Sequence, residues 1–214
     1  MNMKRREFSR AAASAALATS ALLSPLAHAQ AKKYQAGKDY QVLEQPTSVE
    51  APTGKVEVVE FFSYMCPHCN VFEPTFNEWT KRAPKDVSIR RIPVHFLPNF
   101  EVLQRMYFAM EAMNLVEKLH ASVFAAVHGE HRTFTSSDVA ADWMATKGVD
   151  RAKFLEQFNS FTVANKTARA KQLTNAYKID GVPALGVAGR FLIEGSANGL
   201  QIVEALVSDV QAGR

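Results

Sequence analysis

The sequence predicts an α/β fold: one domain interrupted by a block of helices. Strand signals occur in two places, at residues 56–62 and 87–96 and again at 184–187 and 190–193. Between them, from about residue 100 to residue 177, apolar residues recur at helical spacing. This stretch is far longer than an ordinary connection between strands. We therefore expect the two sets of strands to share one sheet and the helices to form an insertion.

The first half of the chain predicts a strand followed directly by a helix. The run Val56 to Phe62 is β-branched and aromatic, and apolar enough to be buried on both faces. A helix should begin just after it, with Pro67 in the first turn, where a missing N–H costs nothing. Phe72, Phe76 and Trp79 share one face of that helix.

The remaining elements follow from the same signals. Residues 40–43 indicate a short strand and 87–96 a longer one closed by Pro98. In the helical block, Ser137 and Asp138 can cap one helix and Asp150 another, and residues 162–177 predict a last, longer helix. The hairpin strands 184–187 and 190–193 then lead into a closing helix at 200–210.

The N-terminus has the pattern of a secretory signal. Lys4, Arg5 and Arg6 precede a short Ala-rich apolar run and the small-residue sequence Ala27-His28-Ala29. A transmembrane anchor is the alternative, but the run is short and weakly apolar for a span. The Arg5-Arg6-Glu7-Phe8 sequence leaves both the Sec and the twin-arginine routes open. We expect residues 1–29 to be a cleaved signal, 30–98 and 178–214 the two parts of the main domain, and 99–177 the insertion.

The charge balance excludes some classes of protein. Of the 25 Lys and Arg residues, 4 lie before Gln30, and of the 21 Asp and Glu residues, 1 does, which leaves 21 against 20. No basic stripe remains to suggest a nucleic-acid partner. No second apolar run is long enough to suggest a membrane protein.

The two cysteines of the chain, Cys66 and Cys69, lie three positions apart in Cys-Pro-His-Cys. A structural zinc site needs four ligands, and only His128 and His131 could supply more, so a metal site is the weak alternative. A structural disulfide is also disfavoured, because closing so short a loop removes little chain entropy. A working redox pair fits best.

The predicted helix start makes the two sulfurs unequal. Unpaired N–H groups and the positive end of the helix dipole favour the thiolate of Cys66, and His68 would act in the same direction. Cys69, one turn further in, should be more enclosed. Since a disulfide cannot gain from thiolate stabilisation, we expect the reduced protein to melt above the oxidised one at neutral pH.

Beside these motifs, the chain resembles the bacterial DsbA family of periplasmic thiol–disulfide oxidoreductases. The resemblance rests on Val59-Glu60-Phe61-Phe62-Ser63-Tyr64 leading into Cys66-Pro67-His68-Cys69, and on Gly181-Val182-Pro183-Ala184 downstream. It implies a thioredoxin fold with an inserted all-helical domain. It also implies that Cys66 attacks, that Cys69 resolves and that His68 stabilises the thiolate.

The resemblance further implies roles for residues outside the motif. Val182–Pro183 would be a cis peptide bond against the active site, with the Val182 backbone pairing with an extended substrate. Leu97 would line the substrate groove. Glu60, a carboxylate in a buried strand, would face a cation on the next strand and help to move protons. The family has a lysine at the position of that cation, whereas this chain has Arg91. Arginine stays charged where lysine can titrate. An ordinary structural ion pair is the alternative.

The resulting expectation is a periplasmic, monomeric oxidase that donates its Cys66–Cys69 disulfide to reduced, unfolded exported proteins. An inner-membrane, quinone-linked partner of the DsbB type would reoxidise it, and no cofactor, metal or nucleic acid is expected. The alternatives are a disulfide isomerase or reductase of the same fold, or a periplasmic chaperone or binding module.

Overall fold

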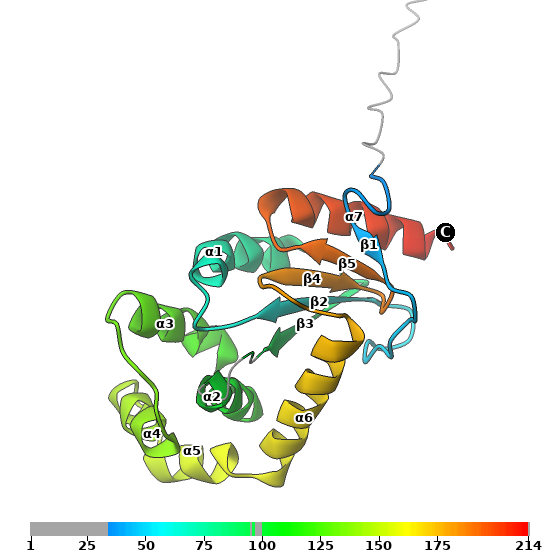
Figure 1. Cartoon of the computed structure of the whole chain (residues 1–214). Helices are drawn as coiled ribbons and strands as arrows, with labels where there is room; N and C mark the ends of the chain where they lie inside the picture. Colours follow the sequence, from blue (N-terminus) through cyan, green and yellow to red (C-terminus); the bar gives the residue numbers. More distant parts are fainter. Residues whose placement is uncertain (1–33, 95, 97–99, 214) are drawn as a thin grey trace, which may run out of the picture. The chain divides into compact units, whose positions relative to one another are not determined.

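One mixed sheet is built from segments on both sides of the helical block. The computed structural model describes residues 34–94, 96 and 100–213. Within these, five strands pair in the order β1-β5-β4-β2-β3 (Figure 1). They are β1 (Gln41–Val42), β2 (Val56–Phe62), β3 (Val87–Pro93), β4 (Ala184–Val187) and β5 (Phe191–Glu194). Only β2 and β3 run parallel among these described strands.

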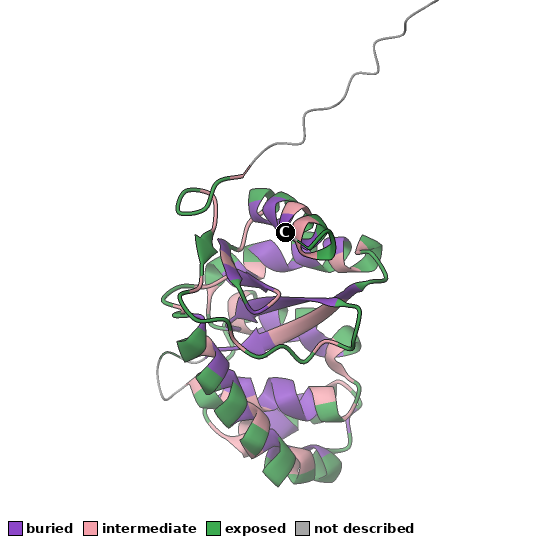
Figure 2. Cartoon of the chain, turned by 90° about the vertical axis from the view of Figure 1, so that its right-hand side faces the viewer, coloured by how far each residue is buried: buried purple, intermediate pink, exposed green. Residues whose placement is uncertain are grey.

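Helices cover both faces of this sheet. They are α1 (Pro67–Arg82), α2 (Glu101–Ala112), α3 (Val116–His128), α4 (Ser137–Thr146), α5 (Arg151–Phe158), α6 (Phe161–Ala176) and α7 (Ala197–Gln211). Helices α1 and α7 pack on one face and α2 and α6 approach the other, with α3, α4 and α5 completing the helical block (Figure 1). Figure 2 shows buried residues along the sheet and on the inner sides of the helices.

Strand β2 is the centre of the sheet and is buried along its whole length. Val58 belongs to the core beneath α1 and α7, whereas Val59 and Phe61 belong to the core shared with the helical block. This follows from the period of two along a strand. The same alternation sends the side chain of Glu60 toward α1, where it meets Glu73 of that helix through Arg91.

Most elements lie where the sequence predicts them, with small differences at their ends. Strand β3 ends at Pro93, before residue 96, and α7 begins at Ala197, before residue 200. The cap of α4 is Ser136, whose Oγ accepts from the Val139 N–H at 3.3 Å, and Ser137 and Asp138 are already helical. Asp150 caps α5 as predicted.

The predicted boundaries of the signal and of the three domain segments remain predictions. Residues 1–29 lie outside the described part of the chain, as does Leu97. The residues from Tyr34 to Arg214 form one unit in which the helical block is not separated from the sheet.

Candidate active site

The Cys-Pro-His-Cys segment forms the beginning of α1, as the sequence predicts. Cys66 is the N-cap residue with an extended backbone (φ −89°, ψ 117°), and Pro67 is the first helical residue. The Cys66 N–H donates to the Ser63 carbonyl at 3.0 Å, which closes the turn between β2 and the helix. As the N-cap residue, Cys66 places its sulfur at the start of the helix. Its side chain makes no cap hydrogen bond, so the N–H groups of the first turn are left without a partner from this residue.

The two cysteines, both free thiols in this structure, have different surroundings. Cys66 is partly exposed, and its Sγ donates to the Val182 carbonyl at 3.3 Å. Cys69 is only 1% exposed, and its Sγ accepts from the Ser63 N–H at 3.5 Å. Burial raises the pKa of the Cys69 thiol. One sulfur is thus accessible and the other enclosed.

The Val182–Pro183 peptide bond is cis, as the resemblance implies. It lies just before β4 and brings the Val182 carbonyl against Cys66. Gly195 supports this loop: its N–H donates to the Pro183 carbonyl at 2.9 Å, and a Cβ on Gly195 would lie 2.6 Å from the Pro183 Cβ. A side chain at position 195 would therefore displace the cis-proline loop.

A groove of about 800 Å³ opens beside this centre. It is bordered by His68, Val71 and Thr75 of the first turns of α1, by residues 179–184 of the cis-proline loop, and by residues 37–41 and 192–197. His68 is exposed, and Val71 is 75% exposed although apolar. The groove offers a partly apolar surface next to the accessible sulfur.

Glu60 and Arg91 form a buried ion pair behind the cysteines. They are register partners on the parallel strands β2 and β3, and the Glu60 Oε2 lies 3.0 Å from the Arg91 Nε. Glu60 is 1% exposed. Burial, together with the nearby charge of Glu73, raises the pKa of Glu60 to about 8 against the opposing effect of Arg91.

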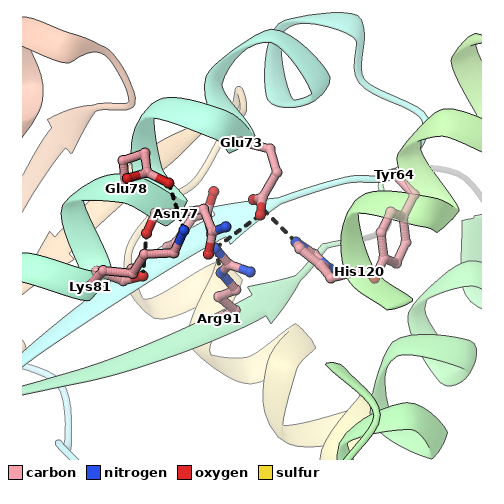
Figure 3. Close-up of polar contacts among 9 residues, drawn as sticks. Tyr64, Glu73, Asn77, Glu78, Lys81, Arg91 and His120 are labelled. Atoms are coloured by element: carbon pink, nitrogen blue, oxygen red, sulfur yellow. Dashed lines mark hydrogen bonds and ion pairs between the residues drawn. The ribbon is translucent and has the colours of Figure 1, made fainter. Parts of the chain in front are cut away.

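Three residues that sequence reasoning missed complete this cluster: Tyr64, Glu73 and His120 (Figure 3). Glu73 Oε1 lies 3.2 Å from an Arg91 amino nitrogen, and Glu73 Oε2 lies 3.3 Å from the His120 Nε2. For two of them, Glu73 and His120, the sequence did contain an indication of a buried polar site. Glu73 falls on the apolar face of α1 and His120 on that of α3, where a polar side chain needs a buried partner.

The structure gives no support to the alternative of a metal site. Among residues 34–94, 96 and 100–213, no group of three or more His, Cys, Asp or Glu side chains is placed to hold a metal ion. His128 instead contacts the Tyr64 carbonyl at 2.8 Å, and His131 is exposed. The described helices also include none that is long and apolar enough to cross a membrane.

A Cys-x-x-Cys pair at a helix start, facing a cis-proline loop at the edge of such a sheet, defines a thiol–disulfide oxidoreductase. Comparison with known proteins agrees. The family model described as the DSBA-like thioredoxin domain matches residues 57–211. The thiol:disulfide interchange proteins DsbA of Pseudomonas aeruginosa and Bordetella parapertussis are 40% and 37% identical, over 86% and 96% of this chain and 89% and 98% of theirs.

Solved structures show the same relationship. The crystal structure of Pseudomonas aeruginosa DsbA matches with a TM-score of 0.78 at 37% identity, covering 84% of this chain and 96% of that one. The oxidoreductase DsbA from Xylella fastidiosa matches with a TM-score of 0.78 at 30% identity, covering 84% and 98%. The chain belongs to the DsbA family. Its thioredoxin fold with a helical insertion is thereby confirmed.

Proposed function

We propose that the protein is an exported dithiol oxidase that donates a Cys66–Cys69 disulfide to reduced, unfolded proteins in the periplasm. The observation that carries the proposal is the asymmetry of the pair: Cys66 lies at the helix N-cap beside the Val182 carbonyl, and Cys69 is enclosed behind it. An accessible sulfur can be attacked by a substrate, and an enclosed one can act only on its neighbour.

The exchange proceeds in two steps. A substrate thiolate attacks Cys66 Sγ, the Cys66–Cys69 bond breaks, and Cys69 leaves as a thiolate that takes up a proton. A second substrate thiolate then attacks the substrate sulfur of the mixed disulfide and releases Cys66 as a thiolate. The substrate loses two electrons and gains a disulfide, and the protein retains the two electrons as a dithiol.

Three features of the site serve this exchange. The N-terminus of α1 favours the leaving Cys66 thiolate at the end of the reaction. Pro67 and the exposed His68 shape that end of the helix, and His68 acts as an additional donor to the thiolate. Val182 and Pro183 present backbone groups to an extended substrate segment, which gives binding with little sequence preference.

Glu60 and Arg91 serve the proton transfer. Cys69 must gain a proton when its disulfide is opened and lose it when the disulfide is restored. Glu60 is a buried acid whose pKa of about 8 suits exchange near neutral pH, and its charge bears on Cys69. Arg91 remains charged throughout and limits how far burial raises the pKa of Glu60.

The reduced protein needs an electron acceptor to act again. We propose an inner-membrane, quinone-linked partner of the DsbB type, with the chain working as a monomer and without a bound cofactor. Support comes from the DsbA family membership and from the export pattern of residues 1–29. The client proteins are reduced polypeptides newly delivered by the same export system.

Two cysteine variants test the function on a reduced, unfolded substrate. Cys66→Ser should abolish disulfide formation. Cys69→Ser, mixed instead with an unfolded substrate that already contains a disulfide, should accumulate a mixed disulfide through Cys66, because the Cys66 thiolate attacks the substrate disulfide and no second cysteine releases the adduct. Mass spectrometry detects this covalent adduct. Unchanged activity of Cys66→Ser would instead favour a chaperone or binding module. An adduct on Cys69 in the Cys66→Ser variant would reverse the assigned roles.

A further inference from the structure

The buried cluster behind the cysteines extends into the helical block. It begins with Glu60 on β2, which is paired with Arg91 on β3. From Arg91 it passes to Glu73 on α1 and to His120 on α3 (Figure 3). It ends at the hydroxyl of Tyr64, which lies 2.6 Å from the His120 Nδ1. Glu60, Tyr64, Glu73 and His120 are all nearly inaccessible to solvent. The helical block therefore contributes a side chain to the surroundings of the redox pair.

The charges in this cluster do not balance without a proton. Arg91 is one fixed cation, and it lies between two carboxylates, Glu60 and Glu73. An uncompensated negative charge in such a site is strongly unfavourable, because a buried ion without a partner loses its hydration and gains nothing in return. One of the two carboxyl groups must therefore hold a proton, and the question is which.

The contacts of His120 indicate which of the two carboxyl groups holds the proton. Burial lowers the pKa of His120, so its imidazole is neutral and has one N–H. The buried Tyr64 hydroxyl has no acceptor other than His120 Nδ1 among the described residues, so it donates to Nδ1. The imidazole N–H is then on Nε2, the nitrogen that faces the Glu73 carboxyl group at 3.3 Å.

Glu73 consequently faces a nitrogen that carries hydrogen at each oxygen, Arg91 at 3.2 Å from Oε1 and His120 at 3.3 Å from Oε2. Glu60 is paired with Arg91 alone among the described residues. Donors stabilise the ionised form of a carboxyl group, so Glu73 is the better place for the charge and Glu60 for the proton. The raised pKa of Glu60 agrees with this assignment.

We propose that His120 and Tyr64 are positioning residues that keep the cluster's exchangeable proton on Glu60: the Tyr64 hydroxyl orients His120, and the Nε2–H of His120 faces and stabilises the Glu73 carboxylate. The inference extends the proposed function, because a proton on Glu60 is available to Cys69. The other titratable groups facing the cluster are the hydroxyl of Tyr107 and the Cys69 thiol. Arg91 and Tyr107 also border a cavity of about 800 Å³ along β3.

The test observes the two carboxyl groups separately. In the reduced full-length protein, ¹³C NMR of the glutamate carboxyl carbons is followed from about pH 5 to about pH 9.5, a range that spans the expected titration, with Glu60→Gln and Glu73→Gln assigning the signals. In the wild type, the change near pH 8 should appear on Glu60 and not on Glu73. His120→Leu removes the donor, and part of that change should move to Glu73.

Two conservative variants guard against misfolding. Tyr64→Phe removes one hydroxyl and frees the His120 tautomer, so Glu73 should take a larger share of the proton. His120→Gln retains an N–H donor and should restore much of the wild-type pattern. The proposal is overturned if Glu73 already holds the proton in the wild type, or if it stays ionised in both His120→Leu and Tyr64→Phe. Should His120→Leu not fold, Tyr64→Phe and His120→Gln decide.

These measurements do not depend on oxidase activity. A wild-type pattern with Glu60 protonated, in a protein whose Cys66→Ser variant remains fully active, would retain the inference and reject the proposed function. The opposite combination would reject the inference alone.

Discussion

Two cysteines of the same motif have opposite environments within one helical turn. Cys66 lies where the helix has unpaired N–H groups and where the cis-proline loop offers a carbonyl. Cys69 is buried, and its thiol has a raised pKa for that reason. A reaction that separates these sulfurs must supply a proton to an enclosed position. The role in proton transfer that we propose for the buried acid Glu60 follows from that requirement.

Glu60 should make stability depend on pH. Its pKa in the folded protein, about 8, lies above the ordinary 4.5, so the folded state binds the proton more tightly. The associated stabilisation is complete below pH 4.5 and is lost as pH rises through 8, by an amount on the order of a few kcal/mol. Urea unfolding of the reduced protein between about pH 5 and about pH 9 should show the loss, and Glu60→Gln should remove most of it.

A surface carboxylate provides the control. Glu78→Gln, which changes an exposed residue of α1, should retain the wild-type dependence. If Glu60→Gln also retained it, and left the exchange rate and the redox potential unchanged, Glu60 and Arg91 would be a structural ion pair without a role in proton transfer.

Not every residue of the site was open to prediction. The motif and the buried strand made Cys66, Cys69 and Glu60 visible in the sequence. Glu73 and His120 were not identified, although each lies on an apolar helix face. A polar residue on such a face reveals burial but not its partner, because α1 and α3 meet only in the folded chain. Tyr64 had no signal at all, since an aromatic residue after a strand is usually part of the core.

At the scale of elements, helix ends were the least predictable features. Three neighbouring residues, Ser136, Ser137 and Asp138, are all good N-caps, and the sequence alone favoured the second and third. The structure selects Ser136, because its extended backbone lets the Oγ reach the Val139 N–H. Long periodic segments such as α1 and α6, by contrast, were predicted to within a residue at their starts.

The choice of cap is testable with neighbouring serines. Ser136→Ala should destabilise the protein by about 1 kcal/mol, because the Val139 N–H loses its acceptor. Ser137→Ala, one residue further and inside the helix, should have little effect. Chemical denaturation of both variants measures the difference. A larger cost for Ser137→Ala would restore the cap predicted from the sequence.

At the scale of the whole molecule, the helical block both completes the core and reaches the active site. Its residues pack against Phe61 and Phe62 of β2, and its helix α3 brings His120 to Glu73 and His128 to the Tyr64 carbonyl. The sequence predicted an insertion from its length and periodicity. It could not predict these contacts, which depend on how the block folds back over the sheet.

The redox state should alter the stability of the whole molecule. Interactions that favour the Cys66 thiolate stabilise the reduced protein and have no counterpart in the disulfide, and the short loop gives the disulfide little stabilisation in return. The reduced protein should therefore melt several degrees above the oxidised one near neutral pH, where each kcal/mol corresponds to about 2–4 °C for a chain of this size. Scanning calorimetry of both forms measures this, and an oxidised form that melts at or above the reduced one would refute it.

The most direct test of the account is the redox equilibrium of the Cys66–Cys69 pair with glutathione, measured on the purified protein at neutral pH. We predict a pair more oxidising than thioredoxin, whose potential is about −270 mV, by more than a factor of ten in the equilibrium constant, or about 30 mV. A potential at or below that of thioredoxin would show that the pair holds its disulfide and would contradict the oxidase assignment.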